Sequence, residues 1–253
     1  MPYINLAHAG RVHYAERGER RPGRTSAVLI HGAGASSAIW LMALARVART
    51  AHAVAIDLPG HGPSDRGDGP LDLARYRDAA GQLAAALCLG PSVLVGHSMG
   101  ALVALEAALA WPDKVRALVL VAAAPRLPVH AALVALLRDD PEAARAWLAD
   151  HGLSPRARPA VRRGLLAAGA AAPDDVTRAD FEIVAATDLT ARLGGVRCPI
   201  TWLDGADDGI VPPAARGDRP GEIVTVPDAG HLLPIEAPAA IAAAAQFSGL
   251  IVR

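Results

Sequence analysis

The 253-residue sequence predicts an α/β fold whose sheet is mostly parallel. Short apolar runs rich in Val, Ile and Leu recur along the first half of the chain, as expected for strands that are buried on both faces of a parallel sheet. Helical stretches separate these runs, and this alternation indicates right-handed crossovers between parallel strands. The length fits one large domain with a substantial core.

The N-terminal part begins with two expected strands, YINLA and RVHYAE, which a turn at Ala9-Gly10 joins into an antiparallel hairpin at a sheet edge. Four buried strands are then expected at residues 27–32, 52–57, 92–98 and 116–123. Helices are expected between them at residues 37–49, 72–88 and 99–110. The last of these helices must end near Pro112, because the residue before a proline avoids the helical region.

The alternation stops between Pro125 and Arg197, where several short helices follow one another, separated by Pro, Gly and Asp. We interpret this segment as an inserted helical cap. Strands resume with CPITWLDG and GEIVTVPDAGH, and a last amphipathic helix is expected at about residues 236–248. The expected organisation is a core of residues 1–124 and 198–253 with a cap of residues 125–197.

Composition and charge argue against several functional classes. The 25 basic and 25 acidic residues give a net charge of zero, and no basic stripe favours binding to nucleic acid or to an anionic membrane surface. Residues 79–105 contain no Asp, Glu, Lys or Arg, but Gly90-Pro91 divides this run, so no membrane span is predicted. A small, near-neutral molecule is the expected partner.

The expected location is the cytoplasm, because the N-terminal sequence lacks the basic start and apolar stretch of a secretory signal. Cys88 and Cys198 stand alone, without C-x-x-C spacing or neighbouring histidines, so neither a disulfide nor a zinc site is expected. We expect two buried thiols in a reducing compartment. No metal-binding or nucleotide-binding motif is found, and no cofactor is expected.

The segment VGHSMG, residues 95–100, carries the first chemical signal. It is a G-x-S-x-G pattern placed where a buried strand turns into a helix, and such a turn presents the serine hydroxyl at the strand end. The flanking glycines let the backbone pass close to neighbouring elements. Ser98 is therefore a candidate nucleophile, and the alternative is that it only caps the helix that starts at Met99. His97 is expected to point away from Ser98.

A nucleophilic serine requires a base, and the base usually requires an orienting acid. His231, directly after the last expected strand, is the candidate base, and the alternative is a histidine that caps the following turn. The acid should lie after a strand end between Ser98 and His231, which points to residues 203–212. Three aspartates lie in that segment: Asp204, Asp207 and Asp208.

Together these motifs resemble the α/β-hydrolase superfamily, in the branch with a small helical cap. The resemblance extends over essentially the whole chain and implies a mostly parallel eight-stranded sheet with helices on both faces. It also implies an active site at the carboxyl edge of the strands. The segments that carry the resemblance are HGAGAS (31–36), DLPGHGPS (57–64), GHSMG (96–100), GADDGIVP (205–212) and PDAGH (227–231).

The resemblance selects one aspartate. In the family the acid segment runs from a glycine through an aspartate to Val-Pro or Thr-Pro, and Gly205 and the pair 211–212 set this register here. The register implies that Asp208 is the acid. Asp207 lies one residue out of register, and Asp204 is expected to belong to the strand or its first turn, where a carboxylate can accept from loop N–H groups.

The resemblance also implies an oxyanion hole of two backbone N–H groups, those of Met99 and Ala33. Because the donors belong to the backbone, their side chains need only be compatible with the loop. His31 and Gly32 are expected to shape the loop before Ala33, and His61 is expected to tie its own loop together.

The expected reaction is hydrolysis of a small or medium carboxylic ester through an acyl-enzyme, carried out by Ser98, His231 and Asp208. The alternatives on the same triad are carbon-carbon bond or enol-lactone hydrolysis, thioester hydrolysis, and a cofactor-free lyase or haloperoxidase-like reaction. A ligand receptor with slow turnover is the alternative from another class. Trp147 and Phe181 are candidate pocket residues, unless they only bury the cap against the core. The sequence leaves the oligomeric state open.

Overall fold

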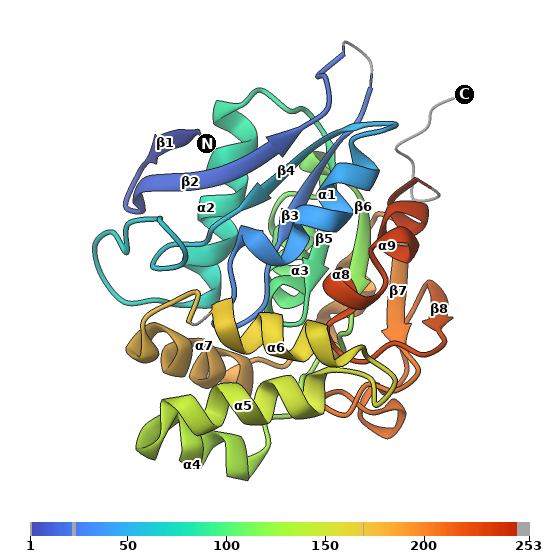
Figure 1. The fold of residues 1–253 in the computed structure, drawn as a ribbon. Helices are drawn as coiled ribbons and strands as arrows, with labels where there is room; N and C mark the ends of the chain where they lie inside the picture. Colours follow the sequence, from blue (N-terminus) through green and yellow to red (C-terminus); the bar gives the residue numbers. More distant parts are fainter. Residues whose placement is uncertain (1, 22–23, 169, 247–253) are drawn as a thin grey trace.

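Within residues 2–21, 24–168 and 170–246, which the computed structural model describes, eight strands form a single sheet (Figure 1). The strands are β1 (Tyr3–Leu6), β2 (Gly10–Arg17), β3 (Ser26–Ile30), β4 (His52–Ile56), β5 (Ser92–His97), β6 (Val115–Val121), β7 (Ile200–Gly205) and β8 (Glu222–Val226). Their order is β1-β2-β4-β3-β5-β6-β7-β8. Only the pairs β1/β2 and β2/β4 are antiparallel in this described part. The predicted mostly parallel, eight-stranded sheet is confirmed.

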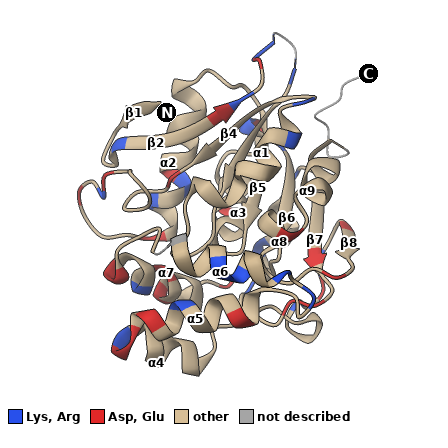
Figure 2. Cartoon of the chain, in the orientation of Figure 1, with Lys and Arg blue, Asp and Glu red and all other residues tan. Residues whose placement is uncertain are grey.

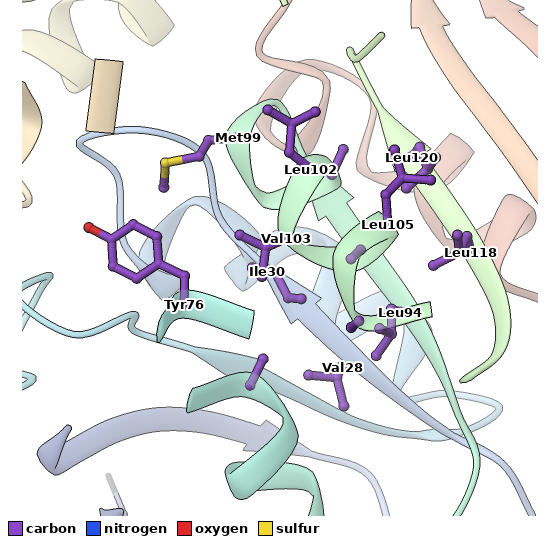
Figure 3. Packing of buried hydrophobic residues seen from close by; sticks show 14 of the residues in the cluster. Val28, Ile30, Tyr76, Leu94, Met99, Leu102, Val103, Leu105, Leu118 and Leu120 are labelled. Atoms are coloured by element: carbon purple, nitrogen blue, oxygen red, sulfur yellow. The ribbon is translucent and has the colours of Figure 1, made fainter. Parts of the chain in front are cut away.

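Helices cover both faces of the sheet, because alternate side chains of each strand point to opposite faces. One face carries α2 (Leu73–Ala86) and α3 (Met99–Ala110), and the other carries α1 (Leu41–Val47), α8 (Leu233–Glu236) and α9 (Pro238–Ala245). Val28, Ile30 and Leu94 pack with residues of α2 and α3 (Figure 3). The intervening Ala27 and Leu29 pack instead with residues of α1 and α9. Burial of each large side chain contributes about 1.5–3 kcal/mol at most.

The carboxyl ends of the central strands meet at one edge of the sheet. Val121 in β6 pairs with His97 at the end of β5, and also with Leu203 near the end of β7. The backbone N–H of Ser98 donates to the carbonyl oxygen of Val121, with an N···O distance of 3.0 Å. The residues that follow β5 and β7 are therefore brought to the same place, where open α/β sheets bind their ligands.

Between β6 and β7 the described residues form helices and turns, without a strand. The helices are α4 (Ala131–Asp139), α5 (Pro141–Gly152), α6 (Pro159–Ala168) and α7 (Asp174–Ala186). Figure 1 shows them gathered at the end of the sheet toward which β6 and β7 point. A small apolar cluster of Leu133, Leu137 and Ala144 forms a core of their own.

Four short 3-10 helices complete the described part of the chain: η1 (Ser37–Trp40), η2 (Pro112–Lys114), η3 (Thr190–Gly195) and η4 (Pro213–Ala215). The helix expected at about residues 236–248 corresponds to α9, which begins two residues later than expected. The chain forms α8 and α9 with a break at Ala237, whose φ of −131° and ψ of 50° are not helical. The break follows from Pro238, because a proline disfavours the helical region for the residue before it. Residues 247–248 lie outside the described part.

The surface carries interspersed charges, and Figure 2 shows acidic and basic positions mixed along α4 to α7. In the described part of the chain, no helix is both long and apolar enough to cross a membrane.

The prediction of two buried thiols is wrong, since Cys88 is exposed and Cys198 is half-buried. Cys88 follows the end of α2 with a φ of 51°, which turns the chain sharply away from the helix.

Candidate active site

Ser98 occupies the turn between β5 and α3 in an uncommon backbone conformation. Its φ is 52° and its ψ is −118°, a region that costs a residue with a Cβ about 1–3 kcal/mol. Ser98 is the N-cap of α3, but its side chain makes no capping hydrogen bond to the helix. The strain and the half-buried side chain place the hydroxyl where a ligand could contact it, as expected for a nucleophile on a sharp strand-to-helix turn.

The two glycines of the motif are required by close backbone contacts. A Cβ built on Gly96 would lie 2.3 Å from the carbonyl oxygen of Gly100, and one on Gly100 would lie 2.2 Å from that of Ile30. Both distances are far shorter than a van der Waals contact. The turn around Ser98 can therefore pack against α3 and β3 only with glycine at these positions.

Asp208 and His231 are hydrogen-bonded in the loops that follow β7 and β8. Asp208 Oδ2 lies 3.0 Å from His231 Nδ1, and both side chains are almost completely buried. Asp208 Oδ1 accepts from the N–H groups of Ile210 and Val211 at 2.9 and 2.8 Å. Burial raises the pKa of the Asp208 carboxyl, but the His231 ring and these N–H groups outweigh it, so the pKa lies below its usual value.

The two other aspartates of this segment have different partners. Asp207 Oδ2 accepts from the hydroxyl of Ser154, in the turn after α5, at 2.6 Å. Asp204, at the buried end of β7, accepts from Arg219 at 2.6 Å and from Arg216 at 3.2 Å. The three carboxylates therefore have different partners. Of the three, only Asp208, which is in the expected register, contacts His231.

His97, the last residue of β5, contacts the loop after β8 that carries His231. Its Nε2–H donates to the carbonyl oxygen of His231 at 2.9 Å, and the two ring centroids are 4.9 Å apart. Burial, aided by the nearby His231 ring, lowers the pKa of His97 to about 3, so the ring is neutral at physiological pH. Among the described residues, no hydrogen bond joins the hydroxyl of Ser98 to His231. Such bonds are often long before a substrate is bound.

The loop after β3 lies against the turn that carries Ser98. A Cβ built on Gly32 would lie 3.2 Å from the Cβ of Ser98, which shows how closely the two segments approach. Burial lowers the pKa of His31 well below its usual value, so the ring is neutral. Its Nδ1–H donates to the carbonyl oxygen of Gly32 at 2.8 Å, and its Nε2 accepts from the N–H of Leu58 at 3.1 Å. His31 therefore fixes this loop.

Within the described part of the chain, the N–H groups of Ala33 and Met99 have no backbone partner, as a pair of oxyanion-hole donors would require. Ala33 follows the fixed carbonyl of Gly32, and Met99 is the first residue of α3. Free N–H groups of this kind at a helix start and in a loop can bind a negatively charged oxygen.

Two carboxylates that the sequence did not single out, the half-buried Glu236 and the buried Asp180, bind the helical segment to the loops of this site. Glu236 accepts from the N–H of Ser154 at 2.8 Å and from the N–H of Gly230 at 3.0 Å. Asp180, in α7, accepts from the N–H of Gly34 and from the side chain of His61, each at 2.8 Å. His61 thus holds more than its own loop. An acidic residue within the apolar face of α7 was the available signal, because Asp180 lies four residues from Val176 and four from Val184.

The candidate pocket residues lie in the helical segment. Trp147 stacks on the ring of His151 with centroids 3.9 Å apart. Phe181 packs against the cluster of Leu133, Leu137 and Ala144. Both side chains therefore have contacts within the helical segment.

A cavity of about 650 Å³ lies elsewhere, at the start of β5 and β6, and its lining includes Ser92, Trp111 and Val115. It is at the opposite end of the strands from Ser98. Among the described residues, no group of three or more His, Cys, Asp or Glu side chains could hold a metal ion.

Comparison with known proteins identifies the family. The model of the alpha/beta hydrolase family matches residues 27–244. The chain belongs to the alpha/beta hydrolase family. The match covers both the segment of Ser98 and the segments of Asp208 and His231.

Individual relatives agree with this membership. The chain is similar to the (E)-2-((N-methylformamido)methylene)succinate hydrolase of Acinetobacter baylyi, with 34% identity over 45% of the chain and 41% of that relative. It is also similar to the pimeloyl-[acyl-carrier protein] methyl ester esterase of Edwardsiella ictaluri, with 29% identity over 83% of the chain and 87% of the relative. Only about two fifths of the Acinetobacter protein thus corresponds to this chain.

A solved structure extends the comparison to the fold. A hydrolase from Pseudomonas aeruginosa PA01 matches with a TM-score of 0.84 and 25% identity, over 99% of this chain and 98% of that one. The sheet and the helices on both of its faces therefore occur in another hydrolase over nearly the whole length of both chains.

Proposed function

We propose that the protein is a serine hydrolase that cleaves a small or medium carboxylic ester through an acyl-enzyme. Ser98 is the nucleophile, His231 the general base and Asp208 the orienting acid. The observation that carries this proposal is the 3.0 Å contact between Asp208 Oδ2 and His231 Nδ1, beside a serine held on a strained strand-to-helix turn. The family membership supports it.

In the first step, Ser98 Oγ attacks the ester carbonyl while His231 Nε2 takes its proton. Asp208 accepts from Nδ1–H, so it holds the tautomer in which Nε2 is free to act as the base. It also stabilises the imidazolium that forms. The same ring then protonates the leaving alcohol, and a water molecule hydrolyses the acyl-enzyme through the reverse transfers.

The negative charge that develops on the carbonyl oxygen is bound by the N–H groups of Ala33 and Met99. Neither group is engaged by another backbone group in the described part of the chain, and Met99 also contributes the positive end of the α3 dipole. Loss of one such donor typically lowers kcat by about 10²–10³. The chemistry requires no metal or cofactor.

The segment 125–197 is proposed as a cap that closes over this edge of the core, with residues 1–124 and 198–253 as the core. A small, uncharged acyl group fits this arrangement better than an acidic carrier, because several basic side chains of the cap are already paired with carboxylates. These are Arg126, Arg138, Arg145, Arg156 and Arg162. Trp147 and Phe181 stay candidates for the cap side of the pocket. A cytoplasmic location is proposed because Cys88 and Cys198 are free thiols, as in a reducing compartment.

A panel of p-nitrophenyl esters tests the proposal, with acetate, butyrate and octanoate as acyl groups. We expect hydrolysis of the short esters by the wild type and a loss of at least about 10⁴-fold in kcat for Ser98→Ala. Ser92→Ala is the matched control, because Ser92 lies at the other end of β5 and donates to the carbonyl oxygen of Gly90. Equal activity of Ser98→Ala and the wild type would overturn the proposal. Reaction of Ser98 with a fluorophosphonate in a protein that hydrolyses none of these esters would favour a lactone, thioester or receptor function.

A further inference from the structure

A carboxylate in α7 contacts three other segments of the chain. Asp180 is fully buried, and its Oδ2 accepts from the N–H of Gly34 and from His61 Nε2, each at 2.8 Å. Its Oδ1 accepts from the hydroxyl of Tyr76, in α2, at 2.6 Å. Asp180 is therefore the point at which the cap meets the loop after β3, the loop after β4 and a helix of the core.

A buried carboxylate is costly unless hydrogen bonds replace its hydration. Asp180 receives these hydrogen bonds from three donors, and hydrogen bonds to an ionised group are about twice as strong as neutral ones. Burial and the charge of Asp180 raise the pKa of Tyr76, so its hydroxyl stays protonated and donates. The cluster thus holds its partners at fixed positions, since loss of the carboxylate would leave buried donors unpaired.

The contact with Gly34 bears directly on the neighbouring Ala33. The N–H of Gly34 belongs to the peptide that follows Ala33, and Asp180 fixes the orientation of that peptide. The peptide that precedes Ala33 contains both the carbonyl of Gly32 and the N–H of Ala33, and His31 fixes it through the carbonyl. The N–H of Ala33 is therefore held from both sides, by a residue of the core and by a residue of the cap.

One backbone hydrogen bond also restrains this loop: the N–H of Ala35 donates to the carbonyl oxygen of Gly32 at 3.2 Å, which closes a turn around Ala33 and Gly34. Gly34 has a φ of 62°, a left-handed conformation, and a glycine without restraint adopts many others. The side chain of Thr177, also in α7, covers it, with Cγ2 at 2.8 Å from where a Cβ would be. The orientation of the peptide after Ala33 therefore depends on α7 as well as on this turn.

We propose that Asp180 is a positioning residue, which holds the N–H of Ala33 in the direction that an oxyanion requires. This inference rests on the proposed function. It makes the oxyanion hole dependent on docking of the cap, because one of its two donors is held by a cap helix. A displaced donor weakens binding of the transition state more than binding of the ester, so the loss should appear in kcat and not in KM.

The test compares three variants by kcat and KM on the best p-nitrophenyl ester, with unfolding in urea measured for each. For Asp180→Ala we expect a 10- to 100-fold loss in kcat with KM within about twofold, somewhat less than loss of the donor itself. Asp180→Asn keeps an oxygen that can accept from Gly34, and should restore kcat to within about fivefold of the wild type. Tyr76→Phe removes another hydrogen bond to the same carboxylate and should leave kcat within about twofold.

If Asp180→Ala does not fold, Asp180→Leu takes its place, because leucine is close in volume and continues the apolar face of Val176 and Val184. If the loss of kcat is proportional to the loss of unfolding free energy in every variant, Tyr76→Phe included, the inference is overturned and Asp180 has a structural role only.

Amide hydrogen exchange of the peptide that contains Ala33 and Gly34 separates this inference from the proposed function. Loss of Asp180 should speed exchange there, with Asp175→Asn as the control, since Asp175 in the same helix forms an exposed ion pair with Arg66 at 2.6 Å. Unchanged exchange in Asp180→Ala or Asp180→Leu would refute the positioning role whether or not any ester is hydrolysed. Faster exchange in the Asp180 variants, in a protein that hydrolyses none of the esters, would refute only the proposed function.

Discussion

His97 gives the protein a stability that depends on pH, and His97→Gln isolates that dependence. The ring is buried beside Ser98, donates through Nε2 to the carbonyl of His231, and has a pKa of about 3. A glutamine can place its amide nitrogen near the position of Nε2, so the variant keeps the donor while it removes the titratable group. The difference in unfolding free energy between the two proteins therefore reports the protonation of His97.

The direction follows from the two states. An unfolded histidine takes up its proton near pH 6.5, whereas His97 in the folded protein takes it up only near pH 3. The unfolded state binds more protons between these values, so the folded state loses stability as the pH falls through 6.5 and continues to lose it until about pH 3. Between pH 7 and pH 5, this pKa difference corresponds to a loss of about 2 kcal/mol.

The assay is urea unfolding of both proteins at pH 8, 7, 6 and 5, followed by circular dichroism. We expect the wild type to lose about 2 kcal/mol more than His97→Gln between pH 7 and pH 5. Titratable groups that do not interact with His97 contribute equally in both proteins, so their contributions cancel in the difference. Parallel stability curves for the two proteins would show that His97 titrates normally, and would refute a buried, neutral ring next to the nucleophile.

Two further pairs of substitutions test other parts of the structure. Asp208→Asn should lower kcat by about 10⁴-fold because it disturbs the tautomer of the histidine, while Asp207→Asn should change it by less than about tenfold because its partner is Ser154. A larger effect for Asp207→Asn, measured on the same ester, would move the acid by one residue. Gly100→Ala would place a Cβ 2.2 Å from a carbonyl oxygen of β3 and should destabilise the protein in urea by about 1–3 kcal/mol or more. Gly164→Ala in α6, where nothing lies within 4 Å, should be neutral or stabilising by up to about 1 kcal/mol, and equal destabilisation of both variants would argue against the close contact.

The strands could be predicted from the sequence because their signal is local. Strands buried on both faces require continuous apolar residues, and each of the four runs predicted as buried strands lies within two residues of β3, β4, β5 or β6. The boundary at Ala237 was missed because the alanine-rich segment that follows favours a helix, and the steric effect of Pro238 on the residue before it sets where that helix begins. Exposure of Cys88 was missed because apolar neighbours in sequence do not determine which side of a helix end faces solvent.

The site could be predicted only in part, because its contacts join distant segments. The residue types and their order pointed to a serine, an acid and a histidine, but chemistry alone did not choose among the three aspartates of one short segment. In the structure, the partners Ser154, Arg216 and Arg219 separate Asp207 and Asp204 from Asp208. The Gly34–Asp180 contact spans 146 residues of sequence, so no local pattern could reveal the partner of that carboxylate.

Peptide mapping of the protein after reaction with a fluorophosphonate tests the proposed catalytic serine most directly. The reagent phosphonylates a serine only where a base activates the hydroxyl and N–H groups bind the phosphonyl oxygen. We predict a single adduct on the peptide that contains Ser98, and none in Ser98→Ala. An adduct on another residue, or one that persists in Ser98→Ala, would contradict the assignment.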